Sequence, residues 1–108
     1  MKENFGEFVH NLRIENNLTL TKLAAALDID QSTLSKIENC KRNFPEEILP
    51  KLSAIFGLDM QKLEQEFYSQ KIAEIIYKKD NVDGLLKLVA DKVKYLQENK
   101  VKQGQFNL

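Results

Sequence analysis

Apolar residues recur along this chain at intervals of three and four, the spacing that places them on one face of an α-helix. The first set comprises Phe5, Phe8, Val9 and Leu12. Thr19 and Asp30 each precede a further set and are residue types that cap the start of a helix. Pro45 stands near the first turn of a fourth set, which Gly57 ends. No segment alternates apolar and polar residues for long, so we predict an all-α protein of about six helices.

Two of these helices are expected in the second half of the chain. The fifth begins after Asp59 and would carry on one side Leu63, Phe67, Ile72, Ile75 and Ile76. Residues 80–84 interrupt it. In the sixth helix the apolar spacings alternate between four and three, which makes a heptad seam of Val82, Leu86, Val89, Val93 and Leu96. Residues 100–108 show no pattern, and we expect them to form a flexible tail.

Three partners remain open for the seam of the sixth helix. It could pair with the same seam of a second copy, which would make the protein a homodimer. It could instead bind a different protein, so that the chain is an interaction module or an antitoxin-like partner. It could also pack against the fifth helix of its own chain, because a seam this short is marginal as an isolated coiled coil.

The composition excludes several classes of function. One Cys and one His among 108 residues leave no internal disulfide and no zinc site, so we expect neither a metal nor a cofactor. The chain has no Gly-rich phosphate loop and no nucleophile beside a base, which argues against an enzyme. We see no signature of a small-molecule pocket. No apolar run approaches the ~18 residues of a membrane helix, and we expect a cytoplasmic protein.

Charge is balanced overall, with 16 Lys and Arg residues against 16 Asp and Glu. This balance argues against a protein that coats nucleic acid, because nonspecific affinity comes from released counterions. Positive charge is nevertheless concentrated locally. Residues 31–44 contain Lys36, Lys41 and Arg42 against the single acid Glu38, a net charge of +2. A neutral chain with so few phosphate anchors would be a selective reader of DNA.

The segment 18–41 contains two short helices joined by a brief turn, the arrangement of a helix-turn-helix motif. In that motif the second helix enters the major groove of DNA. The small Ala24 would let the two helices approach closely. The residues expected between the helices are Leu23, Ala24, Leu27, Ile29, Leu34 and Ile37. The opposite face would carry the polar residues Gln31, Ser32, Thr33, Ser35 and Lys36.

Three stretches, Leu18–Ala24, Ile29–Asn39 and Lys51–Leu58, resemble the Cro/lambda-repressor-like (XRE-type) helix-turn-helix family. The similarity extends from about Phe5 to Leu63. It implies a transcriptional regulator that binds double-stranded DNA and reads a two-fold operator as a homodimeric repressor or activator. The implied architecture is a lambda-repressor-like five-helix DNA-binding domain at 1–67. An additional C-terminal helical extension, the expected dimerisation element, follows at 68–99 before the tail.

The resemblance also implies roles for single residues. The helix 31–39 would lie in the major groove and read bases through Gln31, Ser32, Ser35 and Lys36. The expected phosphate-contacting residues are Thr19, Thr21, Thr33, Lys41 and Arg42. Arg13 and Glu38 resemble a family ion pair that joins the first and third helices, and we interpret this pair as structural.

Two positions depart from the family pattern. Many relatives have a phosphate-contacting Gln where Leu20 stands, and Leu20 cannot make that contact. Relatives commonly have Gly where Cys40 stands, and this Gly ends the recognition helix in a left-handed conformation. A non-Gly residue there would cost about 1–2 kcal/mol if the conformation is kept. Otherwise Asn39 adopts that conformation instead, or the loop differs.

Overall fold

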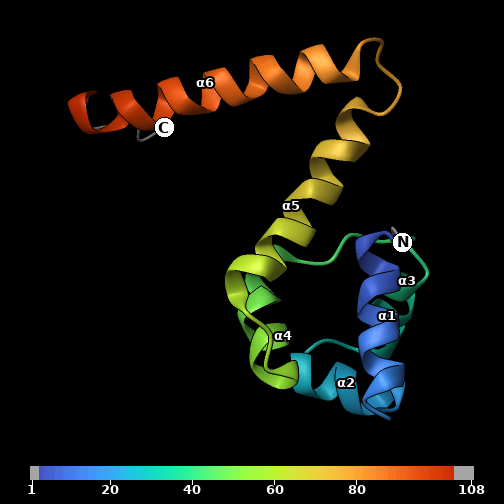
Figure 1. Cartoon of the computed structure of the whole chain (residues 1–108). Coiled ribbons are helices and arrows are strands. Elements are labelled where there is room, and N and C mark those ends of the chain that lie inside the picture. The colour runs from blue at the N-terminus through green and yellow to red at the C-terminus, as the bar shows by residue number, and fades with distance from the viewer. Residues whose placement is uncertain (1–2, 104–108) are drawn as a thin grey trace. The chain divides into compact units, whose positions relative to one another are not determined.

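A computed structural model describes residues 3–103, which form helices and no strand (Figure 1). The elements in order are α1 (Phe5–Glu15), α2 (Leu20–Leu27), α3 (Gln31–Glu38), the 3-10 turn η1 (Glu46–Ile48), α4 (Leu49–Phe56), α5 (Met60–Ile76) and α6 (Val82–Gln103). The all-α prediction is therefore confirmed. The chain divides into two compact units, Met1–Ala73 and Glu74–Leu108.

Side-chain caps start the first three α-helices. The Asn4 side chain accepts from the Glu7 amide, and the Glu7 carboxylate accepts from the Asn4 amide, which completes a capping box for α1. Thr19 caps α2 and Asp30 caps α3, as the sequence predicted. Pro45 precedes a 3-10 turn and not, as expected, the first turn of the fourth α-helix. Its place ahead of this turn suits a residue that lacks an amide proton.

The first four α-helices end in the same way, with a residue of positive φ just beyond the helix. These residues are Asn17, Asp28, Cys40 and Gly57. After α3, the Cys40 amide donates to the Ile37 carbonyl and the Lys41 amide donates to the Lys36 carbonyl. This pair of hydrogen bonds is a Schellman motif. Cys40 has φ 61° whereas Asn39 has φ −94°, so the cysteine keeps the conformation that relatives give to Gly.

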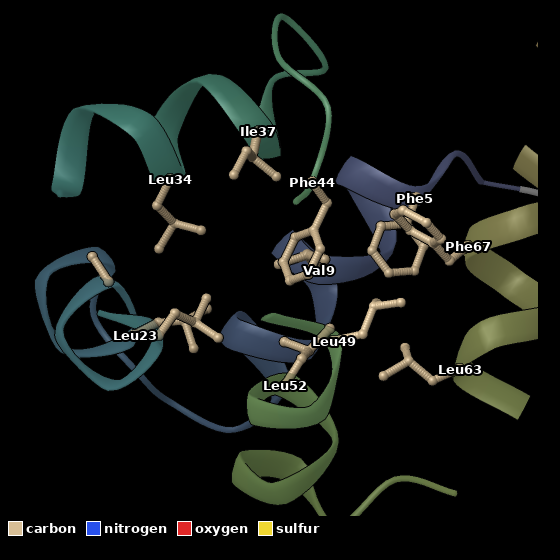
Figure 2. Packing of buried hydrophobic residues seen from close by; sticks show 12 residues of the cluster. Phe5, Val9, Leu23, Leu34, Ile37, Phe44, Leu49, Leu52, Leu63 and Phe67 are labelled. Carbon is tan, nitrogen blue, oxygen red and sulfur yellow. The ribbon is translucent and has the colours of Figure 1, made fainter. Parts of the chain in front are cut away.

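The hydrophobic core of the first unit lies where all its helices converge. Figure 2 shows side chains from α1 to α5 pointing into one interior. The fully buried members include Val9, Leu23, Leu27, Leu34, Ile37, Leu49, Leu52 and Leu63. The rings of Phe44 and Phe67 meet Phe5 edge-on, with centroids 5.3 and 5.4 Å away. These contacts join the loop after α3 and the middle of α5 to α1.

Gly6 permits a close approach between α1 and the end of α3. A Cβ atom at this position would lie 2.2 Å from the Ile37 carbonyl oxygen and 3.0 Å from Cys40 Sγ. The backbone oxygen cannot move away without breaking the end of α3. The missing side chain of Gly6 therefore sets how near α1 lies to α3.

The predicted apolar side of the fifth helix is partly wrong. Leu63, Phe67 and Ile76 are buried, but Ile72 and Ile75 are 43% and 71% exposed. A helix turns by about 100° per residue, which places Ile72 and Ile75 more than a quarter turn away from Leu63. Beyond Phe67 the core-facing positions of α5 are polar. The hydrophobic face of the first unit therefore ends before residue 73, where the unit itself ends.

The second unit contains one long helix, α6. It continues to Gln103, past the point where the hydrophobic pattern stops. The Asn81 side chain accepts a hydrogen bond from the Gly84 amide in its first turn. The remainder of the expected tail, 104–108, lies outside the described residues.

Candidate nucleic-acid interface

The α2–turn–α3 motif is held together by an apolar inner face. Leu23, Ala24 and Leu27 of α2 are buried, as are Leu34 and Ile37 of α3. Ile29, in the turn, is half-buried and packs against the same core. These six residues were expected between the two helices; five are buried and Ile29 packs half-buried against the same core, which confirms that expectation. Because the inner face is fully used for packing, the outer face of α3 is left to solvent.

The outer face of α3 carries the residues expected to read bases. Gln31, Ser32 and Lys36 are exposed, whereas Ser35 is half-buried. Thr33, expected at a phosphate, is also half-buried. Within the described part of the chain, the Lys36 ammonium has no hydrogen-bond or ion-pair partner. A helix face with a free cation and small polar groups suits the edges of base pairs.

The start of α3 is organised around the Asp30 carboxylate. Oδ1 accepts from the Thr33 amide at 2.8 Å and from the Ser32 hydroxyl at 3.2 Å. Hydrogen bonds from the Thr33 side chain and amide, and from Ser32, hold the pKa of Asp30 below its usual value. The positive charge of Arg42 adds to this effect, which places Arg42 within electrostatic reach of Asp30. The Ser32 hydroxyl proton is therefore already engaged within the protein.

The two threonines expected at phosphates differ in what they already bind. Thr19 Oγ1 accepts from the Lys22 amide at 3.1 Å, which leaves the Thr19 hydroxyl proton free to donate. Thr21 Oγ1 donates to the side-chain oxygen of Gln31 at 2.8 Å. Both threonines are exposed. Leu20 between them is half-buried and packs against the core, which explains why an apolar residue is tolerated there.

The loop after α3 places two cations just beyond the end of that helix. Lys41 and Arg42 are both exposed. The Schellman hydrogen bonds at Cys40 and Lys41 tie the start of this loop to α3. Further along, Phe44 is buried against Phe5. The loop is thus anchored on both sides of its two cations.

The back of α3 is fastened to α1 by a buried carboxylate. Glu38, with a side chain only 4% exposed, accepts from Arg13 at 2.8 and 2.9 Å and contacts His10 Nδ1 at 2.7 Å. Arg13 also donates to the Leu18 carbonyl at 3.0 Å. Burial raises the pKa of Glu38, but hydrogen bonds from Arg13 and His10 outweigh it and hold this pKa below its usual value. The hydrogen bond to Glu38 raises the pKa of Arg13.

Sequence reasoning missed two contacts that support the motif. His10 is half-buried and is a partner of Glu38. The Sγ atom of Cys40 lies 2.8 Å from Asn4 Oδ1, the cap of α1. A signal existed for His10, because it stands three residues before Arg13 and so shares its helix face. No local signal joins Cys40 to Asn4.

Neither a metal cluster nor a membrane-spanning helix is found within residues 3–103. No group of three or more His, Cys, Asp and Glu residues there could hold a metal ion. No helix in the same range is long and apolar enough to cross a membrane.

Comparison with known proteins gives a family for the motif. The helix-turn-helix family model of Cro/C1 type matches residues 9–63, which include α2 and α3 entirely. No curated protein matches the chain. A solved complex of the SinR and SinI proteins is 23% identical, with 93% of this chain and 98% of that chain covered at a TM-score of 0.47. Members of the matched family are DNA-binding regulators and not enzymes. Because the match spans half of the chain, this protein belongs to the XRE-type helix-turn-helix family of DNA-binding regulators.

Proposed function

We propose that the chain is a sequence-specific transcriptional regulator of the cytoplasm that reads a two-fold operator as a homodimer. The observation that carries this proposal is the outer face of α3, where Gln31 and Lys36 are exposed above a fully packed inner face. In this proposal α3 lies in the major groove, and Gln31, Ser32, Ser35 and Lys36 contact base edges.

Phosphate contacts would hold α3 in place from both sides. Thr19, at the start of α2, retains a hydroxyl proton to donate, and the helix dipole there favours an anion. Lys41 and Arg42 would contact the backbone beyond the other end of α3. The half-buried Thr33 shares its hydrogen bonds with Asp30 and is the weakest candidate. With few phosphate anchors in a neutral chain, affinity for random DNA should be low.

The second copy would bind through α6. Its seam residues Leu86, Val93 and Leu96 are 42%, 44% and 51% exposed, and Val82 and Val89 are half-buried. An exposed heptad seam is stabilised when another helix packs against it and buries its apolar side chains. A second copy offers the same seam, and its symmetry would place two α3 helices on half-sites about 34 Å apart.

The exposed seam also suits a helix of a different protein. In this alternative the chain is an interaction or antitoxin-like module, and DNA binding is secondary. The two functions differ in what they require of DNA. A homodimer selects a two-fold sequence, whereas an interaction module selects none.

Selection of bound sequences from a random DNA pool tests the proposal. We expect enrichment of a two-fold motif. In the double variant Gln31→Ala, Lys36→Ala, each lost base contact should cost about 1–3 kcal/mol of binding free energy and relax the preference at its position. The matched control is Gln61→Ala, Lys62→Ala, which removes an exposed Gln and Lys from α5.

Unchanged base preference in a folded Gln31→Ala, Lys36→Ala variant would show that α3 is not the reading face. No enrichment by the unmodified protein would favour the interaction module. Circular dichroism spectra of both double variants establish that the fold is intact.

A further inference from the structure

A single side-chain hydrogen bond joins the two helices of the motif on their outer side. The Thr21 hydroxyl, in the first turn of α2, donates to Oε1 of Gln31, the first residue of α3, at 2.8 Å. Among the described residues, no other side-chain hydrogen bond connects α2 with α3. Both side chains are exposed, so this bond lies on the face proposed to meet DNA.

This bond uses the proton that a phosphate contact would need. A threonine hydroxyl has one proton to donate, and here it goes to the Gln31 oxygen. A phosphate oxygen accepts hydrogen bonds and cannot replace that interaction without releasing Gln31. Thr21 therefore differs from Thr19, whose hydroxyl accepts a backbone hydrogen bond and keeps its proton.

The bond also decides which end of the Gln31 amide faces outward. With Oε1 held toward α2, both Nε2 protons remain available, and Oε1 keeps one lone pair. Adenine presents in the major groove an acceptor at N7 and a donor at N6, which this orientation matches. Guanine presents acceptors at both N7 and O6. In the arrangement that pairs Nε2 with N7 and Oε1 with the group at position 6, guanine O6 would therefore face the Gln31 oxygen.

We propose that Thr21 is a positioning residue that orients the Gln31 amide for adenine and sets the base preference at that position, and does not anchor a phosphate. This inference rests on the proposed function, because it requires that Gln31 contacts a base. Thr21 acts through Gln31, and its removal matters only while Gln31 is present.

A double-mutant cycle separates the two roles of Thr21. Thr21→Val preserves the shape of the side chain and removes the hydroxyl, and Thr21→Ser retains the hydroxyl as the matched control. Each is combined with Gln31→Ala. Affinity is measured for two DNA sequences. One is the selected operator. The other is the same operator with guanine in place of adenine at the position where the Gln31→Ala variant no longer discriminates between bases.

We expect Thr21→Val to reduce the adenine-over-guanine discrimination about fivefold, in keeping with one lost neutral hydrogen bond. Thr21→Ser should preserve the discrimination. In the Gln31→Ala background Thr21→Val should have no further effect. Equal thermal unfolding of the variants establishes that none is misfolded.

Thr21→Val could instead reduce affinity equally for both DNA sequences, also in the Gln31→Ala background. That result would identify Thr21 as a phosphate contact. It would leave the proposed function standing and overturn this inference. No effect of Thr21→Val on discrimination would also overturn it. If Gln31→Ala by itself changed neither affinity nor preference, the proposed reading face would fail, and this inference with it.

Discussion

At the scale of single residues, the backbone of Cys40 is strained. It has φ 61°, a conformation that L-residues other than Asn and Asp seldom adopt. Asn17 and Asp28 occupy the same place after α1 and α2, and their short polar side chains tolerate it. Cysteine has no such compensation from its own backbone. Its thiol contact with Asn4 Oδ1 is the interaction that offsets part of the cost.

We expect Cys40→Gly to raise the free energy of unfolding by about 1 kcal/mol, because glycine adopts positive φ without strain. Urea denaturation at neutral pH measures the change. Cys40→Ala is the control, since it also loses the thiol but keeps the Cβ atom. A glycine variant no more stable than the alanine variant would contradict a strained backbone at this position.

At the scale of the elements, the contact between α1 and α3 depends on Arg13 and Glu38. Glu38 is buried at the back of the recognition helix, and Arg13 holds it from α1. Gly6 allows the same two helices to approach closely near the end of α3. The orientation of α3 therefore depends on α1 as much as on α2.

Arg13→Met should lower the free energy of unfolding by about 3 kcal/mol at pH 7, because it leaves Glu38 buried without its main partner. The pKa of Glu38 is held below its usual value of 4.5, so the pair stabilises the fold at neutral pH. This contribution is lost as the pH falls through the lowered pKa. The penalty of Arg13→Met, measured by urea denaturation from pH 7 to pH 3, should shrink on acidification.

The exposed Arg42→Met is the control, and its effect on the free energy of unfolding should stay within about 0.5 kcal/mol. Asp30 also has a lowered pKa and loses stability in the same direction, but its contribution is shared by Arg13→Met and the unmodified protein. A penalty for Arg13→Met that stays constant down to pH 3 would contradict the assigned role of Glu38.

Local sequence signals account for most of the helices. They do not always predict which face of a helix is buried. The caps at Thr19 and Asp30 and the end at Gly57 were predictable because each depends on neighbours within one helical turn. The exposed Ile72 and Ile75 were not, because they are apolar residues on a face turned away from Leu63. The α3 residues that the sequence suggested for base reading do lie on the outer face of this helix. The sequence did not reveal which of their protons are already engaged.

At the scale of the whole molecule, we expect assembly to depend on α6. The double variant Val89→Asp, Val93→Asp places two charges on the seam and should convert a homodimer into a monomer. Sedimentation at several protein concentrations measures this. The control Lys87→Gln, Lys94→Gln shifts the net charge by the same amount away from the seam and should leave the dimer intact.

A dimer that persists in the Val89→Asp, Val93→Asp variant would show that another surface holds the two copies together. An unmodified chain that sediments as a monomer at all concentrations would overturn the homodimer. In either case the DNA-binding unit, 1–73, has its own core and should keep its fold.

The sequence by itself determined the helices, the buried face of the motif and the family, because capping, spacing and short motifs are properties of neighbouring residues. The local positive charge within a neutral chain was equally visible there. Only the tertiary structure decided that Cys40 keeps the left-handed conformation, that His10 joins Arg13 at Glu38, and that Thr21 binds Gln31. The contacts at Glu38 and between Thr21 and Gln31 join residues 10 or more positions apart in the chain, and they depend on how closely the helices approach. The conformation of Cys40 accompanies the hydrogen bonds that close the end of α3.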